Sequence, residues 1–137
     1  MTHTDGQGNM VIRLPIGGHE DIVLARQKVR DIAAEMGFTL LDQTRIVTAV
    51  SELARNIVVH AQAGAMSVFR PQERKGLKIV FADQGPGIPD VARAMQDSYS
   101  SVGSLGLGLQ GAKRLSDAME ISSTPGQGTT ITITKWL

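Results

Sequence analysis

One carboxylate and one carboxamide stand four positions apart in a stretch with helical periodicity. Glu52 and Asn56 would therefore share one helix face, about 6 Å from each other. An acidic and a neutral oxygen facing the same space suit a Mg²⁺–nucleotide site, because Mg²⁺ keeps several waters and takes most of its other oxygens from phosphates. A solvated helix face is the alternative interpretation of the pair.

A second candidate is the segment Asp83-Gln-Gly-Pro-Gly-Ile88, which directly follows an apolar run. A carboxylate held at a strand end can accept a hydrogen bond from an exocyclic amine such as that of adenine. Gly85 and Gly87 would let the chain turn against a flat ligand. The alternative is that Asp83 only caps a Gly-Pro-Gly turn.

A third candidate is the glycine-rich segment Gly103-Ser-Leu-Gly-Leu-Gly-Leu109, which leads into an expected helix. Backbone N–H groups and the dipole at such a helix start favour a phosphate. Gly106 to Gly111 also matches the dinucleotide pattern by letter, but it follows a polar loop and lacks the acidic residue about twenty positions on. Ala112 stands where a Walker-type loop needs lysine. The segment therefore disfavours a dinucleotide-binding fold and excludes a Walker-type site.

The elements that position these residues can be predicted from the spacing of apolar side chains. A 3.6-residue rhythm predicts one helix from Glu20 to Met36, ending at Gly37, and a second from Asp42, the expected N-cap, to about His60. Strands are expected at Asn9–Leu14, Met66–Arg70, Leu77–Asp83, Ala118–Ser122 and Thr129–Trp136, and further helices at Pro89–Met95 and Leu105–Leu115.

This order of elements lacks the regular alternation of a doubly wound parallel sheet. It predicts an α/β fold: a two-layer α/β sandwich whose mixed, mostly antiparallel sheet carries helices on one face. Threonines alternate with Ile131 and Ile133 along the last strand, so the other face is expected to be less hydrophobic. No repeat or linker divides the chain, and residues 1–137 are expected to form one domain.

Composition excludes several classes of function. Lys and Arg number 14 against 13 Asp and Glu, a balance too even for the basic stripe that nucleic-acid binding requires. The absence of cysteine rules out disulfides, Cys-ligated zinc and a thiol nucleophile. No apolar run is longer than Ile79–Ala82, and the polar N-terminus does not resemble a signal peptide. A cytoplasmic protein with no membrane or nucleic-acid partner is expected.

Four motifs in this order resemble the ATP-binding boxes of the GHKL superfamily: Ser51–Asn56, Asp83–Ile88, Gly103–Leu109 and Gly128-Thr129. The similarity covers nearly the whole chain, from Asp21 to Leu137. Within the superfamily the chain is similar to the small serine/threonine kinases of bacterial anti-sigma regulation. Arg55 and the ending Lys-Trp-Leu favour the stressosome switch kinases over the sigma-binding type.

The resemblance implies a Bergerat-type fold that uses ATP and Mg²⁺. It makes Glu52 the general base or water-orienting carboxylate and Asn56 the Mg²⁺ ligand. Asp83 would bind the adenine amine, assisted by Thr129. The glycines would complete the site: Gly85 and Gly87 in the adenine pocket, and Gly103, Gly106 and Gly108 in the lid and phosphate loop.

The resemblance also implies a separate protein substrate, namely a serine or threonine on a STAS-domain antagonist. The freed kinase would then bind and activate a PP2C-type phosphatase. The leading hypothesis is thus a Mg²⁺–ATP-dependent serine/threonine kinase that acts as a partner-switching regulator in bacterial stress signalling. The alternative is an ATP-binding anti-sigma factor, with a sigma factor as partner, or a non-catalytic ATP-dependent binding module. Glu52 argues against a non-catalytic site, which would not need that carboxylate.

Overall fold

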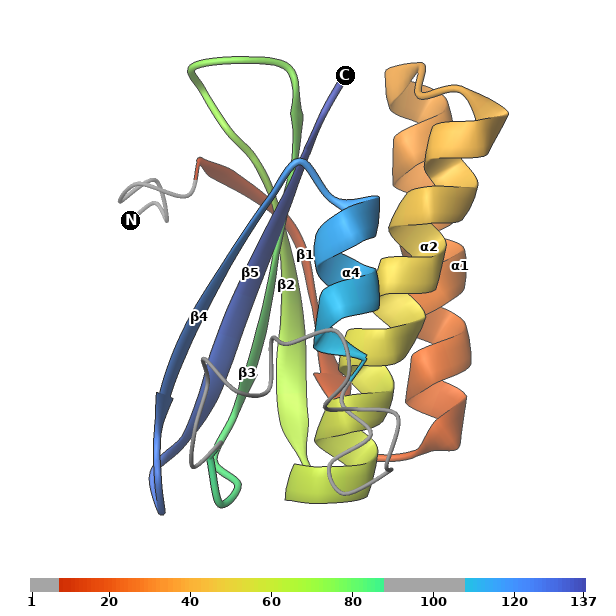
Figure 1. Ribbon diagram of the computed structural model, residues 1–137. Helices are drawn as coiled ribbons and strands as arrows, with labels where there is room; N and C mark the ends of the chain where they lie inside the picture. Colours follow the sequence, from red (N-terminus) through yellow and green to blue (C-terminus); the bar gives the residue numbers. More distant parts are fainter. Residues whose placement is uncertain (1–7, 88–107) are drawn as a thin grey trace.

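A five-stranded antiparallel sheet forms one layer of the molecule, and helices cover one of its faces (Figure 1). This computed structural model describes residues 8–87 and 108–137. The two-layer α/β architecture predicted from the sequence is confirmed, and every strand pairing in the described ranges is antiparallel.

The sheet has the strand order β1-β2-β3-β5-β4. Its strands are β1 (Asn9–Ile16), β2 (Gly64–Arg70), β3 (Gly76–Asp83), β4 (Ala118–Thr124) and β5 (Gly128–Trp136). Strands β2 and β3 form an antiparallel hairpin across the polar connection that precedes Gly76. The last strand of the chain, β5, lies between β3 and β4. It therefore places the end of the chain beside β3, which is far from it in sequence.

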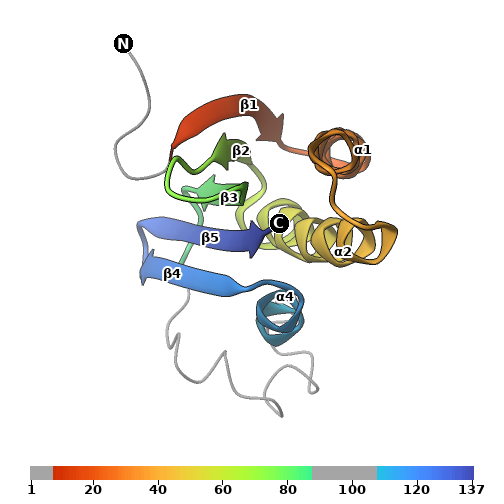
Figure 2. The same cartoon turned by 90° about the horizontal axis from the view of Figure 1, so that it is seen from above.

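The helices α1 (His19–Met36), α2 (Leu40–Asn56) and α4 (Leu109–Leu115) all pack on the same face of the sheet. Figure 2 shows α1 near β1, α4 near β4 and α2 between them. Helix α1 ends as predicted at Gly37, whose φ of 98° lies in the left-handed region that favours glycine. The predicted helix Pro89–Met95 and residues 105–107 of the predicted helix Leu105–Leu115 lie outside the described residues.

The N-cap of α2 differs from the prediction. The Thr39 hydroxyl, not the Asp42 carboxylate, caps the helix, accepting a hydrogen bond from the Asp42 backbone N–H at 3.1 Å. Asp42 is instead a residue of the first turn, where Arg45 Nη1 donates to its Oδ1 at 3.0 Å. This hydrogen bond holds the pKa of Asp42 below its usual range. Thr39 is the N-cap because its hydroxyl reaches the backbone N–H three residues on, and that N–H belongs to Asp42.

Removal of this cap should weaken the fold measurably. For Thr39→Ala we expect a loss of about 1 kcal/mol in the free energy of unfolding, because a first-turn N–H loses its protein acceptor. Urea denaturation of the variant beside the parent gives the difference. Thr48→Ala is the control, since Thr48 lies on the exposed side of the same helix and alanine is the better helix former there. Equal stability of Thr39→Ala and the parent would show that the cap contributes nothing.

The helical run continues past Asn56 but changes its hydrogen-bond pattern. Residues Ile57–Ala61 form a π-helix, η1, where an uninterrupted helix to about His60 was expected. The chain then turns at Gln62, whose φ is 71°, and enters β2 at Gly64. A side chain at Gly64 would collide with the Ala82 carbonyl oxygen of β3, so glycine is required for this close approach. Single-turn π segments in longer helices are frequent at functional sites.

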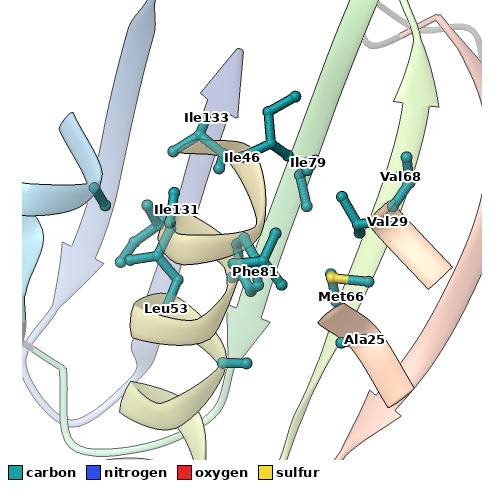
Figure 3. Close-up of a cluster of buried hydrophobic side chains, with 14 of the residues drawn as sticks. Ala25, Val29, Ile46, Leu53, Met66, Val68, Ile79, Phe81, Ile131 and Ile133 are labelled. Carbon is teal, nitrogen blue, oxygen red and sulfur yellow. The ribbon is translucent and has the colours of Figure 1, made fainter. Parts of the chain in front are cut away.

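The hydrophobic core lies between the helices and the inner face of the sheet (Figure 3). It joins Ala25 and Val29 of α1, Ile46 and Leu53 of α2, Met66 and Val68 of β2, Ile79 and Phe81 of β3, and Ile131 and Ile133 of β5. On β5, Thr132 and Thr134 are also buried, although they alternate with the core isoleucines, whereas Thr130 on the same side of the strand is exposed. Within the described ranges, no helix has the length and apolar character needed to cross a membrane.

Candidate active site

A cavity of about 100 Å³ opens at the end of the sheet where α2, η1 and the carboxyl end of β3 meet. Figure 1 places these ends, the start of α4 and the β4–β5 turn at the same pole of the molecule. The walls of the cavity are mainly apolar, with four polar side chains among them. The lining residues are Leu53, Asn56, Ile57, His60, Ala61, Phe81, Asp83, Pro86, Gly87, Thr129 and Ile131.

Asp83 is the one acidic residue in this lining. It is the last residue of β3, and its Oδ1 accepts a hydrogen bond from the Gly85 backbone N–H at 2.8 Å. In the described part of the chain this is the only hydrogen bond that the Asp83 carboxylate makes. The turn-capping role considered for Asp83 is therefore real, and it uses one oxygen, so a second oxygen remains available to a ligand amine.

Thr129 lies beside Asp83 because of the sheet register. The two residues are directly opposite each other on β5 and β3. Thr129 is largely buried, and its hydroxyl oxygen lies 3.0 Å from the Ser123 hydroxyl on β4. The preceding Gly128 has a φ of 108°, and a side chain there would collide with the Asp83 carbonyl oxygen. The Gly128-Thr129 pair thus brings a hydroxyl next to the carboxylate.

The two glycines after Asp83 have different environments. Gly87 lines the cavity, has a φ of 80°, and would place a Cβ 2.6 Å from the Thr124 carbonyl oxygen. Gly85 is not part of the lining; a Cβ there would lie 2.5 Å from the Ala61 Cβ of η1. The close approach predicted for Gly85 is therefore an approach to the protein's own π-helix.

Glu52 and Asn56 occupy consecutive turns at the carboxyl end of α2, as the spacing predicts. Asn56 lines the cavity, whereas Glu52 stands next to it without lining it. The Glu52 carboxylate lies between two neighbours: Arg55 Nη1 is 3.5 Å from its Oε2, and its Oε1 faces Gly108 at the start of α4. Gly108 has a φ of 62°, and a Cβ there would collide with Oε1. Gly103 and Gly106 lie outside the described residues.

Sequence reasoning missed most of the apolar wall and one polar residue. The wall comes from Leu53, Ile57, Phe81 and Ile131, which the helix and strand patterns assign only to the core. His60 was expected only as the approximate end of the second helix, yet it lines the cavity from η1 while its side chain is still exposed. The signal was its position four residues after Asn56, which places it on the same helix face.

The side chains of the cavity fit a purine nucleotide with Mg²⁺. An apolar slot with one free carboxylate oxygen suits a flat ring that carries an amine, and the Asn56 amide oxygen suits an ion that takes its other ligands from phosphates and water. Within residues 8–87 and 108–137, no group of three or more His, Asp or Glu side chains could hold a metal ion by itself.

Comparison with protein families matches residues 19–135 to the histidine kinase-like ATPase domain. The serine/threonine-protein kinase RsbT of Bacillus subtilis is 51% identical over 119 residues, which cover 85% of this chain and 90% of that protein. An anti-sigma F factor of Caldanaerobacter subterraneus is 31% identical over 119 residues, covering 82% of this chain and 83% of the relative.

The fold also occurs in a solved structure. A chain in the SiaB–SiaC complex from Pseudomonas aeruginosa superposes with a TM-score of 0.58 at 11% identity, over 93% of this chain and 91% of that one. At this identity the likeness concerns the fold alone.

Proposed function

The chain belongs to the histidine kinase-like ATPase domain family, with serine/threonine kinase and anti-sigma factor relatives, and we propose that it is a Mg²⁺–ATP-dependent protein kinase that acts as a partner-switching regulator. One observation carries the proposal. Glu52 stands one helical turn before Asn56, beside a cavity that holds Asp83 on an otherwise apolar wall. A carboxylate outside the ligand pocket but next to it is what phosphoryl transfer needs and what simple nucleotide binding does not.

The adenine ring is proposed to bind in the apolar slot. Its exocyclic amine would donate to the free oxygen of Asp83, with the Thr129 hydroxyl completing the polar edge. Phe81 and Ile131 would exclude water from the ring faces, which strengthens the hydrogen bond. Gly87 is proposed to shape this pocket as a lining residue, and Gly85 to do so indirectly, through its close approach to Ala61.

The phosphates are proposed to extend from the slot toward Asn56 and the glycine-rich segment. Asn56 would hold Mg²⁺, which supplies charge neutralisation for the phosphates when bound. The lid and phosphate loop are proposed to include Gly103, Gly106 and Gly108, as the GHKL resemblance implies.

Glu52 is proposed to act on the acceptor hydroxyl. Its carboxylate accepts the hydroxyl proton while the hydroxyl oxygen bonds to the γ-phosphorus; the bond from that phosphorus to the bridging oxygen breaks and ADP leaves. A positioned base and charge neutralisation are sufficient for this step, because phosphoryl transfer depends mainly on positioning.

The acceptor is proposed to be a serine or threonine on a separate STAS-domain protein, and the freed kinase is proposed to activate a PP2C-type phosphatase. Support comes from the relative named serine/threonine-protein kinase RsbT and from the GHKL resemblance. Incubation with γ-labelled ATP, Mg²⁺ and each STAS protein of the same genome tests the proposal. Label should appear on one of them; label on none, with ATP still bound, contradicts kinase activity toward this class.

An anti-sigma factor is the second candidate, favoured by the 31% identical anti-sigma F factor. In that case ATP serves mainly a binding reaction with a sigma factor. Size-exclusion chromatography of the protein with the sigma factors of its genome, with and without ATP, separates the two candidates. A stable complex with a sigma factor and no phosphorylated STAS protein would favour this alternative.

Removal of the proposed Mg²⁺ ligand should change the metal requirement. For Asn56→Ala we expect both nucleotide affinity and transfer to fall, and the Mg²⁺ concentration for half-maximal transfer to rise by about tenfold or more, since one protein oxygen is lost from the ion. Magnesium titrations of nucleotide binding and of transfer measure this. Thr44→Ala, on the exposed first part of α2, is the control. An unchanged Mg²⁺ requirement in Asn56→Ala would remove Asn56 from the metal site.

A further inference from the structure

The two oxygens of the Glu52 carboxylate have different neighbours, an arginine of the same helix and a glycine at the start of α4. Arg55 Nη1 lies 3.5 Å from Oε2, and Gly108 faces Oε1 so closely that any other residue there would collide with it. A glutamate on a helix surface normally samples several rotamers. Here a cation lies 3.5 Å away on one side, and on the other side the lack of a Cβ at Gly108 leaves room for this orientation.

Fold stability does not account for the ion pair. The side chains of Arg55 and Glu52 are 54% and 35% exposed, and ion pairs in such surroundings contribute little to folding because water and salt screen them. Glu52 instead lies within helical reach of two residues, Arg55 three positions on and the cavity residue Asn56 four positions on.

The described residues around the cavity carry negative charge, and Arg55 is the cation next to Glu52. None of the described lining residues is lysine or arginine, whereas Asp83 and the neighbouring Glu52 both carry carboxylates. Arg55 therefore supplies positive charge directly to Glu52. Without it, the carboxylate would be free to turn away from the position next to Asn56.

We propose that Arg55 is a positioning residue, which holds the Glu52 carboxylate in the orientation needed to accept the proton of the acceptor hydroxyl. The proposal rests on the proposed kinase function and adds a residue to it. On the opposite side of the carboxylate, Gly108 has no side chain and so leaves room for Oε1 in this orientation.

Helix α2 contains a matched control for this pair. Arg45 Nη1 and Asp42 Oδ1 form an ion pair with the same three-residue spacing and a shorter distance, 3.0 Å, near the opposite end of the helix. Arg45→Ala likewise removes a guanidinium from an i, i+3 pair of α2, although Asp42 keeps Lys135 Nζ at 3.7 Å. Any difference between the two variants in phosphoryl transfer then reports the location of Arg55 and not the loss of a surface ion pair.

The kinetic test uses the full chain with its STAS substrate. Arg55→Ala should lower kcat roughly tenfold or more with the KM for ATP unchanged, Arg55→Lys should recover part of the loss, and Arg45→Ala should behave as the parent. In the Glu52→Ala background, Arg55→Ala should cause no further loss, because it acts through Glu52. A parent-like kcat for Arg55→Ala, or an equal loss in both backgrounds, overturns the proposal.

A second measurement does not depend on transfer. In protein labelled with ¹³C-glutamate, the side-chain carboxylate resonance of Glu52 should move in Arg55→Ala and stay in place in Arg45→Ala; a resonance unmoved by both variants overturns the contact itself. A parent protein that binds ATP and labels no STAS protein contradicts the kinase function, and with it the catalytic part of this proposal. An active parent with a fully active Arg55→Ala contradicts this proposal alone.

Discussion

Glu52→Ala should slow phosphoryl transfer by roughly 10²–10⁴-fold, the usual contribution of a positioned acid–base group. ATP affinity should change little, because Glu52 does not line the cavity. Fold stability should also be nearly unchanged, since the side chain is partly exposed and makes one long ion pair. Single-turnover phosphorylation beside calorimetric ATP titration separates these quantities.

The matched control is Glu35→Ala. Glu35 is also a helical glutamate with an arginine partner, Arg70, at 4.0 Å, but it lies in the last turn of α1 away from the cavity. Parent-like transfer is expected from it. If Glu52→Ala transferred phosphate as fast as Glu35→Ala, the proposed general base would be wrong. If Glu52→Ala lost ATP binding instead, the carboxylate would belong to the nucleotide site.

The two long helices could be predicted because local rules decide them. Apolar residues such as Ala25, Val29 and Ala33 recur with helical spacing and are all fully buried. Gly37 ends α1 because it can adopt a positive φ. The predicted N-cap of α2, Asp42, was wrong by one turn. Thr39 and Asp42 are both good capping residues, and only the backbone path decides between them.

From residue spacing alone, the site could be predicted only where its residues lie close together in the chain, and joining Asp83 with Thr129 required the resemblance to the GHKL boxes. Glu52 and Asn56 share a face through helical spacing alone, and Asp83 is adjacent to its own turn. The neighbourhood of Asp83 and Thr129, by contrast, depends on β5 inserting between β3 and β4, which no local pattern specifies. Thr132 is buried as well, although alternation with the core isoleucines would have left it at the surface.

The π-helix escaped prediction for a physical reason. Its sequence, Ile57-Val-Val-His-Ala61, continues an apolar helical pattern, and a change from i→i−4 to i→i−5 bonding leaves no signature in residue type. The consequence is considerable, because η1 supplies Ile57, His60 and Ala61 to the cavity wall. The contact of Ala61 with Gly85 also joins this segment to the turn after Asp83.

Asp83→Asn should weaken ATP binding by about 1–3 kcal/mol, or about 5- to 150-fold in Kd. The amide keeps one acceptor oxygen, which can retain the bond from the Gly85 N–H, so the turn should survive. Its second group is an NH₂ donor, which would meet the donating amine of adenine and leave both unpaired. Calorimetry with ATP and with an analogue that lacks the exocyclic amine measures the effect: the variant should lose affinity for ATP and lose little for the analogue.

Asp117→Asn is the control that separates recognition from structure. Asp117 also accepts a backbone N–H, from Trp136 at 2.7 Å, but near the opposite end of β5 from Thr129. Both substitutions keep an oxygen for the backbone N–H, and Asp117→Asn also loses the ion pair of Oδ1 with Lys135 Nζ at 3.5 Å, so its cost to fold stability should be at least as large, whereas only Asp83→Asn should affect the nucleotide. Equal ATP affinity in the two variants, with both folded, would make Asp83 a turn residue and nothing more. Loss of ATP and analogue binding to the same extent would instead place the effect of Asp83 on the shape of the pocket and not on the amine.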